Sequence, residues 1–154
     1  MKIHTLQSEV WVPRPREEVF EFFSHAENLE VLTPHWLHFS ILSPGPIAMK
    51  TGTQVQYRLR LRGIPLRWDS EITVWQPPYS FVDEQRRGPY RLWVHEHQFL
   101  EDAGGTKVRD SVHYSVAGGT LVNRLFVAPD LKKIFEFRRE KVAEIFGQSS
   151  KGAV

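Results

Sequence analysis

The sequence predicts an α+β fold in which a curved seven-stranded antiparallel sheet carries a long C-terminal helix over its concave face. Two short helices are expected after the first strand, and six extended segments with turn signals between them follow over residues 38–116. After Gly118 and Gly119 the apolar residues change from alternation to helical spacing. Strands followed by a helix are typical of α+β proteins, and a sheet of about seven strands curls. One helix over the hollow side of such a sheet can leave a cavity beneath it.

The N-terminal part predicts one strand and two short helices. Residues 7–12, QSEVWV, form the expected strand. Residues 15–25 form the first expected helix, because Pro15 suits a first helical turn and Glu17 and Glu18 suit its positive end. Residues 26–32 form the second, which ends before Pro34.

The six further strands are predicted from alternating polar and apolar residues. They are expected over residues 38–43, 53–61, 66–76, 80–86, 91–101 and 106–116. A hairpin centred near Gly63 pairs Leu59 with Trp68 and Val55 with Ile72, so these four side chains face the core. A second hairpin falls on residues 101–106, where two glycines are available for positive φ angles.

The terminal helix is predicted from apolar residues at helical spacing. They are Leu121, Leu125, Leu131, Ile134, Phe135, Val142, Ile145 and Phe146. Pro129 lies within this pattern and is expected to kink the helix or to begin a second segment. The basic residues Arg138, Arg139 and Lys141 are expected mostly on the solvated side. Residues 1–147 are expected to form one domain, and residues 148–154 a flexible tail.

Two histidines are predicted to face inward in the strand over residues 91–101. Centring the last hairpin on DAGG places Phe99, His97, His95 and Trp93 opposite Val108, Asp110, Val112 and Tyr114 respectively. The facing strand is apolar on this side, so the histidines point to the core and Asp110 lies against His97. We expect an inward polar cluster made of Asp83, Gln85, Arg91, His95, His97 and Asp110.

Three interpretations of these histidines remain open. His-x-His on one strand face, with Asp110 near, is a weak metal pattern without a firm further ligand, so no metal is predicted. The second interpretation is purely structural: a buried histidine forms a hydrogen bond with Asp110 because buried polar groups must be paired. A few polar groups among apolar walls are also the usual composition of a small-molecule site. The last two interpretations are compatible.

The amino-acid composition limits the kinds of chemistry and binding partner that can be expected of this chain. The chain has 154 residues with 41% hydrophobic and 12% aromatic residues, and its net charge is +2. Twenty basic and eighteen acidic residues are too evenly balanced to predict nucleic-acid binding. Without cysteine, disulfides and thiolate chemistry are excluded. No stretch approaches the ~18 apolar residues of a membrane span, so we expect a cytoplasmic protein without stable membrane insertion.

Four stretches of the chain resemble a known superfamily. They are VFEFFSHAENLEVLTP, WDSEITVWQPPYSFVDEQRRGPYRLWVHEHQF, GGTKVRDSVHYSV and LKKIFEFRREKV. Together they resemble the START-like, or SRPBCC, superfamily, whose helix-grip fold is shared with the birch-pollen allergen. The likeness covers about residues 3–147 and is strongest to the polyketide cyclase/dehydrase-like, ligand-binding SRPBCC group.

The resemblance implies a deep hydrophobic pocket between the sheet and the C-terminal helix. No cofactor is expected. The positions that best match its lining are Tyr57, Trp68, Phe81, Asp83, Trp93, His95, His97, Asp110, Tyr114 and Phe135. Members bind lipids, sterols or polyketides, so the leading prediction is a binder of a hydrophobic small molecule.

Two alternatives stay open beside that prediction. One is a cyclase/dehydratase-type enzyme, for which His95, His97 and Asp110 are the candidate catalytic residues, with His95 or His97 shuttling protons and Tyr114 or Trp93 orienting the substrate. The other is an interaction domain whose pocket is filled by its own aromatic side chains.

Overall fold

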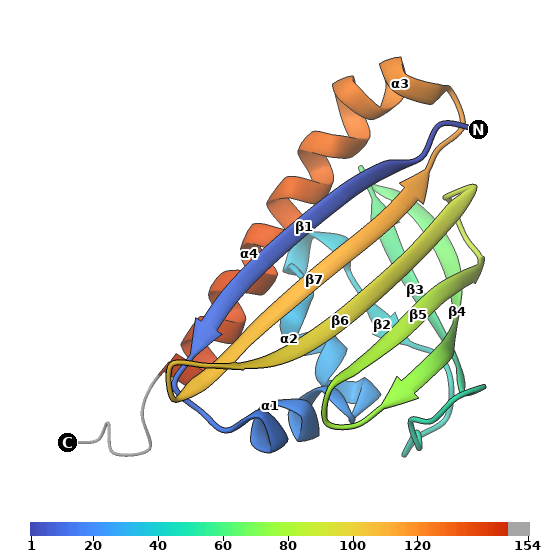
Figure 1. Cartoon of the computed structure of the whole chain (residues 1–154). Coiled ribbons are helices and arrows are strands. Elements are labelled where there is room, and N and C mark those ends of the chain that lie inside the picture. The colour runs from blue at the N-terminus through green and yellow to red at the C-terminus, as the bar shows by residue number, and fades with distance from the viewer. Residues whose placement is uncertain (148–154) are drawn as a thin grey trace.

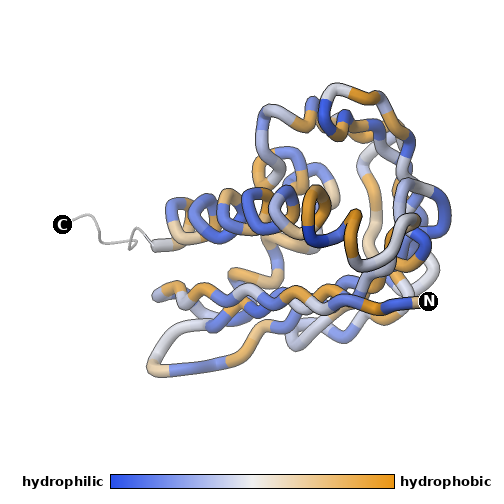
Figure 2. Tube along the Cα trace, turned by 90° about the horizontal axis from the view of Figure 1, so that it is seen from above, coloured by the Kyte–Doolittle hydropathy of each residue, from blue (hydrophilic) through white to orange (hydrophobic). Residues whose placement is uncertain are grey.

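The computed structural model describes residues 1–147, and the tail predicted over residues 148–154 lies outside the described residues. One antiparallel sheet has the strand order β1-β7-β6-β5-β4-β3-β2. Helix α4 lies along one face of this sheet (Figures 1 and 2). The predicted fold class, with seven strands, short helices after the first strand and a long C-terminal helix, is confirmed.

The element order follows the predicted one with shifts at the ends. The strands are β1 His4–Val12, β2 Ser40–Ile41, β3 Gln54–Leu61, β4 Ile64–Gln76, β5 Ser80–Arg87, β6 Leu92–Asp102 and β7 Gly105–Ser115. The helices are α1 Arg16–Phe23, α2 Leu29–Leu32, α3 Gly119–Val122 and α4 Ala128–Gly147. Short 3-10 turns at Ala26–Asn28 and His35–Leu37 flank α2. None of the helices within residues 1–147 combines the length and the apolar character that crossing a bilayer requires.

The C-terminal helix changes its hydrogen-bonding pattern just before Pro129. Residues Asn123–Val127 form a π-helical turn between α3 and α4. Proline lacks the backbone N–H and its ring crowds the carbonyl four residues earlier, so a regular α-helical ladder cannot run through this position. The predicted break at Pro129 therefore takes the form of a widened turn.

The β3–β4 hairpin is tighter than predicted. Its two-residue turn has positive φ at Arg62 (50°) and Gly63 (80°), which is the type I′ geometry that matches strand twist. Tyr57 consequently pairs with Trp68, and Leu59 with Leu66, so the predicted Leu59–Trp68 register is wrong by two residues. A shift of two keeps every side chain on its predicted face.

The β6–β7 hairpin has the predicted register, but its glycines have different roles. Ala103 and Gly104 take the positive φ angles, 49° and 80°. Gly105 is needed for space instead, because a Cβ there would lie 2.2 Å from the carbonyl oxygen of Val12. Close approach of β1 therefore fixes this position.

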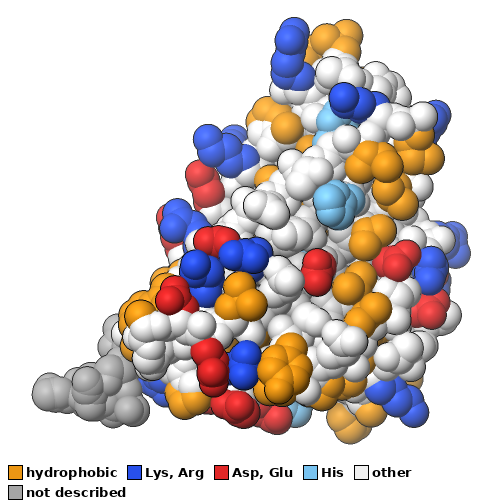
Figure 3. Space-filling view, viewed as in Figure 1, with side chains coloured by type: hydrophobic (Ala, Val, Ile, Leu, Met, Phe, Trp, Pro, Cys, Tyr) orange, Lys and Arg blue, Asp and Glu red, His pale blue; other side chains and the backbone are white. Residues whose placement is uncertain are grey.

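The core consists of two apolar clusters under α4. One gathers α1 and the last turns of α4 around Phe20, Phe81 and Phe99. The other gathers Trp68, Trp93 and Phe135. On the side of the molecule seen in Figure 3, basic and acidic side chains are interspersed. An ion pair between Arg109 and Glu9 joins β7 to β1.

Replacing Phe99 with alanine should lower the free energy of unfolding by about 3–5 kcal/mol. Phe99 is fully buried, with ring centroids 5.1 Å from Phe20 and 5.2 Å from Phe23, so truncation leaves a cavity. Urea unfolding measures this loss. The control Leu121→Ala, at an exposed helix position, should stay within about 0.5 kcal/mol of wild type, and comparable losses in both variants would contradict the packing described.

Candidate functional site

Strand register brings the predicted polar residues together on the concave face. Across β5–β6, Asp83 pairs with His95 and Phe81 with His97. Across β6–β7, His97 pairs with Asp110, as predicted. Because side chains alternate along a strand, these residues share one face of the sheet. Two imidazoles thus lie between two carboxylates that come from the neighbouring strands.

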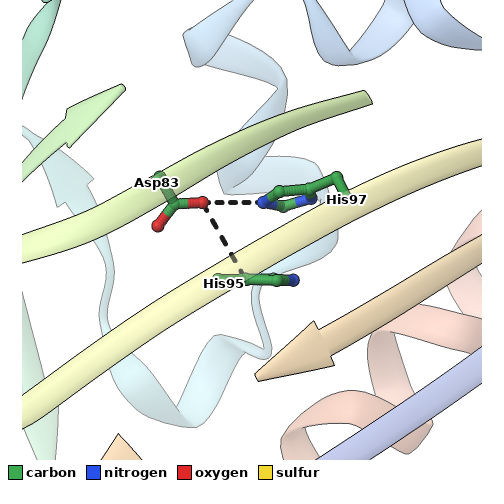
Figure 4. Close-up of side chains that lie close together, drawn as sticks. All are labelled: Asp83, His95 and His97. Carbon is green, nitrogen blue, oxygen red and sulfur yellow. Dashed lines mark hydrogen bonds and ion pairs between the residues drawn. The ribbon is translucent and has the colours of Figure 1, made fainter. Parts of the chain in front are cut away.

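The hydrogen bonds cross this register diagonally. Asp110 was expected to pair with His97, but its Oδ1 lies 2.8 Å from Nε2 of His95 and 3.5 Å from Nδ1 of His97. His97 Nε2 instead lies 2.7 Å from Oδ2 of Asp83 (Figure 4). Each histidine therefore bonds to the aspartate that faces the other histidine, because diagonal neighbours are within reach of long side chains. The two imidazoles stack with centroids 3.7 Å apart.

Arg138 completes the cluster from α4. It is buried, with its Nε and Nη2 donating to Asp110 at 3.2 and 3.3 Å, so the expectation that it lies on the solvated side is wrong. The helical spacing could have revealed it, because Leu131, Phe135, Arg138 and Val142 share one face of α4 and all are buried. The ion pair joins α4 to β7 beneath the helix.

Two members of the predicted polar cluster lie elsewhere. Arg91 is exposed and lies just before β6. Gln85 uses its side-chain amide to hold the backbone of Tyr90, whose N–H and carbonyl it bonds at 3.0 and 2.7 Å. Sequence alternation placed Gln85 on the correct face, but the tight turn after β5 offers it local backbone partners.

Arg138 also fixes the tautomer of His97. Its Nη2 lies 3.2 Å from Nδ1 of His97, and a guanidinium can only donate. Nδ1 therefore accepts, and the proton of the neutral ring is on Nε2, which donates to Asp83. Both ring nitrogens of His97 are thus engaged, whereas His95 commits only Nε2, to Asp110.

Burial and neighbouring charges perturb the ionisation of the cluster. Burial, and then repulsion from His95, lower the pKa of His97 to about 4 despite the opposing hydrogen bond to Asp83. Burial alone would raise the pKa of Asp110, but Arg138 and His95 outweigh it and hold that pKa well below the usual range. The pKa of Asp83 is also lowered, because the hydrogen bond from His97 and nearby positive charge outweigh its burial.

A cavity of about 170 Å³ lies beside this cluster. Among its lining residues are eight of those predicted from the sequence: Tyr57, Trp68, Phe81, Asp83, Trp93, His95, His97 and Phe135. Asp110 lies behind the imidazoles against Arg138. Tyr114 bonds Asn123 through its hydroxyl, 2.7 Å away, and is not part of the lining. Ser70, Tyr90 and Arg138 line the cavity without having been predicted to.

An outer hollow adjoins the cavity between the β3–β4 hairpin and the start of α4. Leu37, Leu61 and Ile134 line both spaces, so the hollow marks the approach from solvent. Arg62 of the hairpin bonds both carboxylate oxygens of Asp130 on α4, at 2.9 and 3.0 Å. This bidentate pair connects the two sides of the approach.

Asp83, His95 and His97 are the described residues whose donor atoms come close enough to hold a metal, all within 4.8 Å of one another. The position of the proton on His97 does not favour metal binding. His97 Nε2 carries a proton toward Asp83, and the guanidinium of Arg138 lies 3.2 Å from the same ring. A metal would have to displace that proton and withstand the adjacent positive charge.

Comparison with known proteins identifies the family. The family described as "Polyketide cyclase / dehydrase and lipid transport" matches residues 12–141. The chain belongs to this family. No curated protein matches the chain in sequence.

Solved structures of other proteins have folds similar to that of this polyketide cyclase/dehydrase family member. The Zhui aromatase/cyclase from Streptomyces sp. R1128 has a TM-score of 0.76 at 14% identity, covering 99% of this chain and 100% of the other. Ginseng major latex-like protein 151 from Panax ginseng has a TM-score of 0.69 at 11% identity, covering 94% and 97%. Ara h 8.0201 has a TM-score of 0.68 at 15% identity, covering 96% and 100%. The helix-grip fold of the START-like, or SRPBCC, superfamily is thereby confirmed.

The free energy of unfolding should fall by up to about 3 kcal/mol on acidification from pH 6.5 to pH 4 because of His97. Its pKa is about 4 in the folded protein and about 6.5 in an unfolded chain. Between these values the unfolded state binds the extra proton, so stability rises with pH and is lost as pH falls. Asp83 and Asp110, whose pKa values are lowered, extend the loss below about pH 4.

Urea unfolding of the His97→Gln variant across this range checks the assignment, since its pH slope should be flatter. The control His113→Gln changes an exposed histidine of β7 and should keep the wild-type slope. A wild-type slope in His97→Gln would show that another group is responsible.

Proposed function

We propose that this protein binds a hydrophobic small molecule, of lipid, sterol or polyketide-like character, in the cavity between the sheet and α4. The observation that carries the proposal is a mostly apolar cavity whose polar lining residues include Asp83, Ser70 and His95. Apolar walls give affinity, and a few convergent polar groups fix orientation. Membership of a family described by polyketide and lipid chemistry supports the same class of ligand.

The size of the cavity favours a compact ligand. Its volume of about 170 Å³ lies below the roughly 300–1,000 Å³ of sites for drug-sized molecules. It is close to an engineered cavity of about 150 Å³ that binds benzene. Side chains such as Trp68 and Trp93 occupy much of the space beneath α4, so a larger ligand requires them to move. The same packing of Trp68 and Trp93 supports the alternative of an interaction domain whose pocket is filled by its own side chains.

Filling the cavity should abolish binding. Val55 is buried in its lining, so Val55→Phe should weaken binding at least tenfold by removing the space for the ligand. Binding is measured by quenching of tryptophan fluorescence, with native mass spectrometry, over a panel of lipids, sterols and aromatic polyketides. Circular dichroism checks that the variant is folded.

The matched control is Val31→Phe, the same substitution at an exposed position of α2, which should bind as wild type does. Wild-type protein that binds no member of the panel would refute the lipid, sterol or polyketide-like character of the ligand. Equal binding by both variants would place the ligand outside the cavity.

A second candidate function is cyclase/dehydratase-type catalysis with His95 as the acid/base. The observation that favours it is the orientation of His95 by Asp110, which engages Nε2 and leaves Nδ1 on the side of Asp83 at 3.9 Å. A proton taken by Nδ1 gives an imidazolium stabilised by a carboxylate on each side. His97 suits this role less, because both its nitrogens are engaged.

Enzymatic function predicts that His95→Gln lowers kcat for a polyketide-type substrate by about 10²–10⁴-fold while changing its Kd much less. Single-turnover assays with direct binding measurements separate the two quantities. His113→Gln serves as the control and should retain full turnover. Unchanged kcat in His95→Gln would exclude this role for the residue.

A further inference from the structure

We infer that the ligand of this cavity is a compact aromatic ammonium ion, whose cationic group binds Asp83 and His95 and whose ring lies against the aromatic wall. This inference rests on the proposed binding function and names the chemical class of its ligand.

The charges of the polar cluster do not balance within the protein. Asp110 is neutralised by Arg138, which donates to both its oxygens. Asp83 receives its hydrogen bonds from His97 at 2.7 Å and Ser70 at 3.4 Å. The cluster thus holds two carboxylates against one guanidinium, and with His97 held as the neutral tautomer the carboxylate without a guanidinium partner is Asp83. Arg138 is the only Lys or Arg among the cavity-lining residues, and it is already paired with Asp110.

Asp83 is hydrogen-bonded, but no Lys or Arg side chain of the cavity lining forms an ion pair with it. Burial of an ionised group without a counter-ion is unfavourable, and 17% of the Asp83 side chain is accessible, which is more than for the other members of the cluster. Asp83 is therefore the member that can meet a ligand. A cation that enters the cavity supplies the missing counter-charge.

His95 offers a second acceptor next to Asp83. Its Nε2 is committed to Asp110, so the neutral ring has its lone pair on Nδ1. Within residues 1–147 no hydrogen bond reaches Nδ1, and Oδ2 of Asp83 lies 3.9 Å from it. Only 7% of the His95 side chain is accessible. A primary ammonium has three N–H donors, which allows it to bond Asp83 and His95 together.

The walls near these acceptors are aromatic and in mutual contact. Ring centroids of Trp68 and Trp93 are 5.2 Å apart, those of Tyr90 and Trp93 are 4.8 Å apart, and those of Tyr57 and Trp68 are 6.1 Å apart. All four residues line the cavity. Aromatic faces attract cations, more strongly when water is excluded, and they stack on an aromatic ligand.

Trp68 adds a donor that has no acceptor. Its indole Nε1–H is buried and unpartnered among the described residues, although buried indole donors usually find a partner. A ring substituent with an oxygen atom on the ligand would satisfy it. An anionic ligand fits less well, since its charge would lie against Asp83.

Three probes of nearly equal shape test the inference: 2-phenylethylamine, 2-phenylethanol and 3-phenylpropionate. Binding to the full chain is measured by calorimetry and tryptophan fluorescence at pH 8, where an alkylamine is charged and an imidazole of ordinary pKa is neutral. The amine should bind at least tenfold more tightly than the alcohol, and the carboxylate most weakly. This order in the wild-type protein tests the inference without any substitution.

The variant Asp83→Asn removes the charge and keeps the shape. It should reduce the preference for the amine over the alcohol to about twofold or less and leave binding of the alcohol nearly unchanged. The control Asp69→Asn changes an aspartate of β4 that forms an ion pair with Arg67 of the same strand. It should keep the full preference for the amine. An unchanged preference in Asp83→Asn would overturn the inference.

The outcomes separate this inference from the proposed function. Equal binding of amine and alcohol, or tighter binding of the carboxylate, overturns the ammonium assignment and leaves the binding function in place. If a lipid, sterol or polyketide from the panel binds and none of the three probes does, the ammonium assignment is likewise overturned and the binding function remains. Failure of every compound to bind removes both.

Discussion

The buried network of Asp83, His97, His95, Asp110 and Arg138 is the constraint on which the rest of this structure depends. It joins β5, β6, β7 and α4 through hydrogen bonds of 2.7–3.3 Å. Buried charges are costly unless they are paired, and in this network the charge of Asp110 is paired with that of Arg138, so loss of either would leave the other uncompensated. The position of the helix over the sheet is therefore tied to the ionisation of groups that line the cavity.

The network also explains why the interior is not fully packed. It lies between the two apolar clusters, with Phe81 stacked on His97 at 4.0 Å on one side and Phe135 against His95 at 5.5 Å on the other. Apolar side chains cannot close over Asp83 without leaving a carboxylate in a dry, unpaired state. A space beside Asp83 costs less than its complete burial, so the polar groups and the cavity occur together for one physical reason.

The sequence predicted this arrangement as far as backbone geometry determines it. The alternation of residues along β6 was enough to predict that His95 and His97 face inward. The position of the DAGG turn was enough to predict that Asp110 lies opposite His97. The bonding partners were not predictable in this way, because they depend on stacking of the imidazoles and on diagonal reach. Arg138 was predictable from helical spacing, but its charge suggested solvent exposure. A charged residue at an apolar position of a helix is thus best examined for a buried partner of opposite charge.

The relation between fold and ligand follows from the same residues. Structures with 11–15% identity share the helix-grip fold over nearly the whole chain, so the fold requires a helix against a curved sheet and leaves most side chains free to differ. The chemical character of the cavity is then determined by a few positions on its polar wall. Here one guanidinium faces two carboxylates, and its bonds go to the deeper one, Asp110. The carboxylate nearer the cavity, Asp83, has no guanidinium partner, and this asymmetry is the feature of the polar wall on which the proposed preference for a cation over a neutral lipid depends.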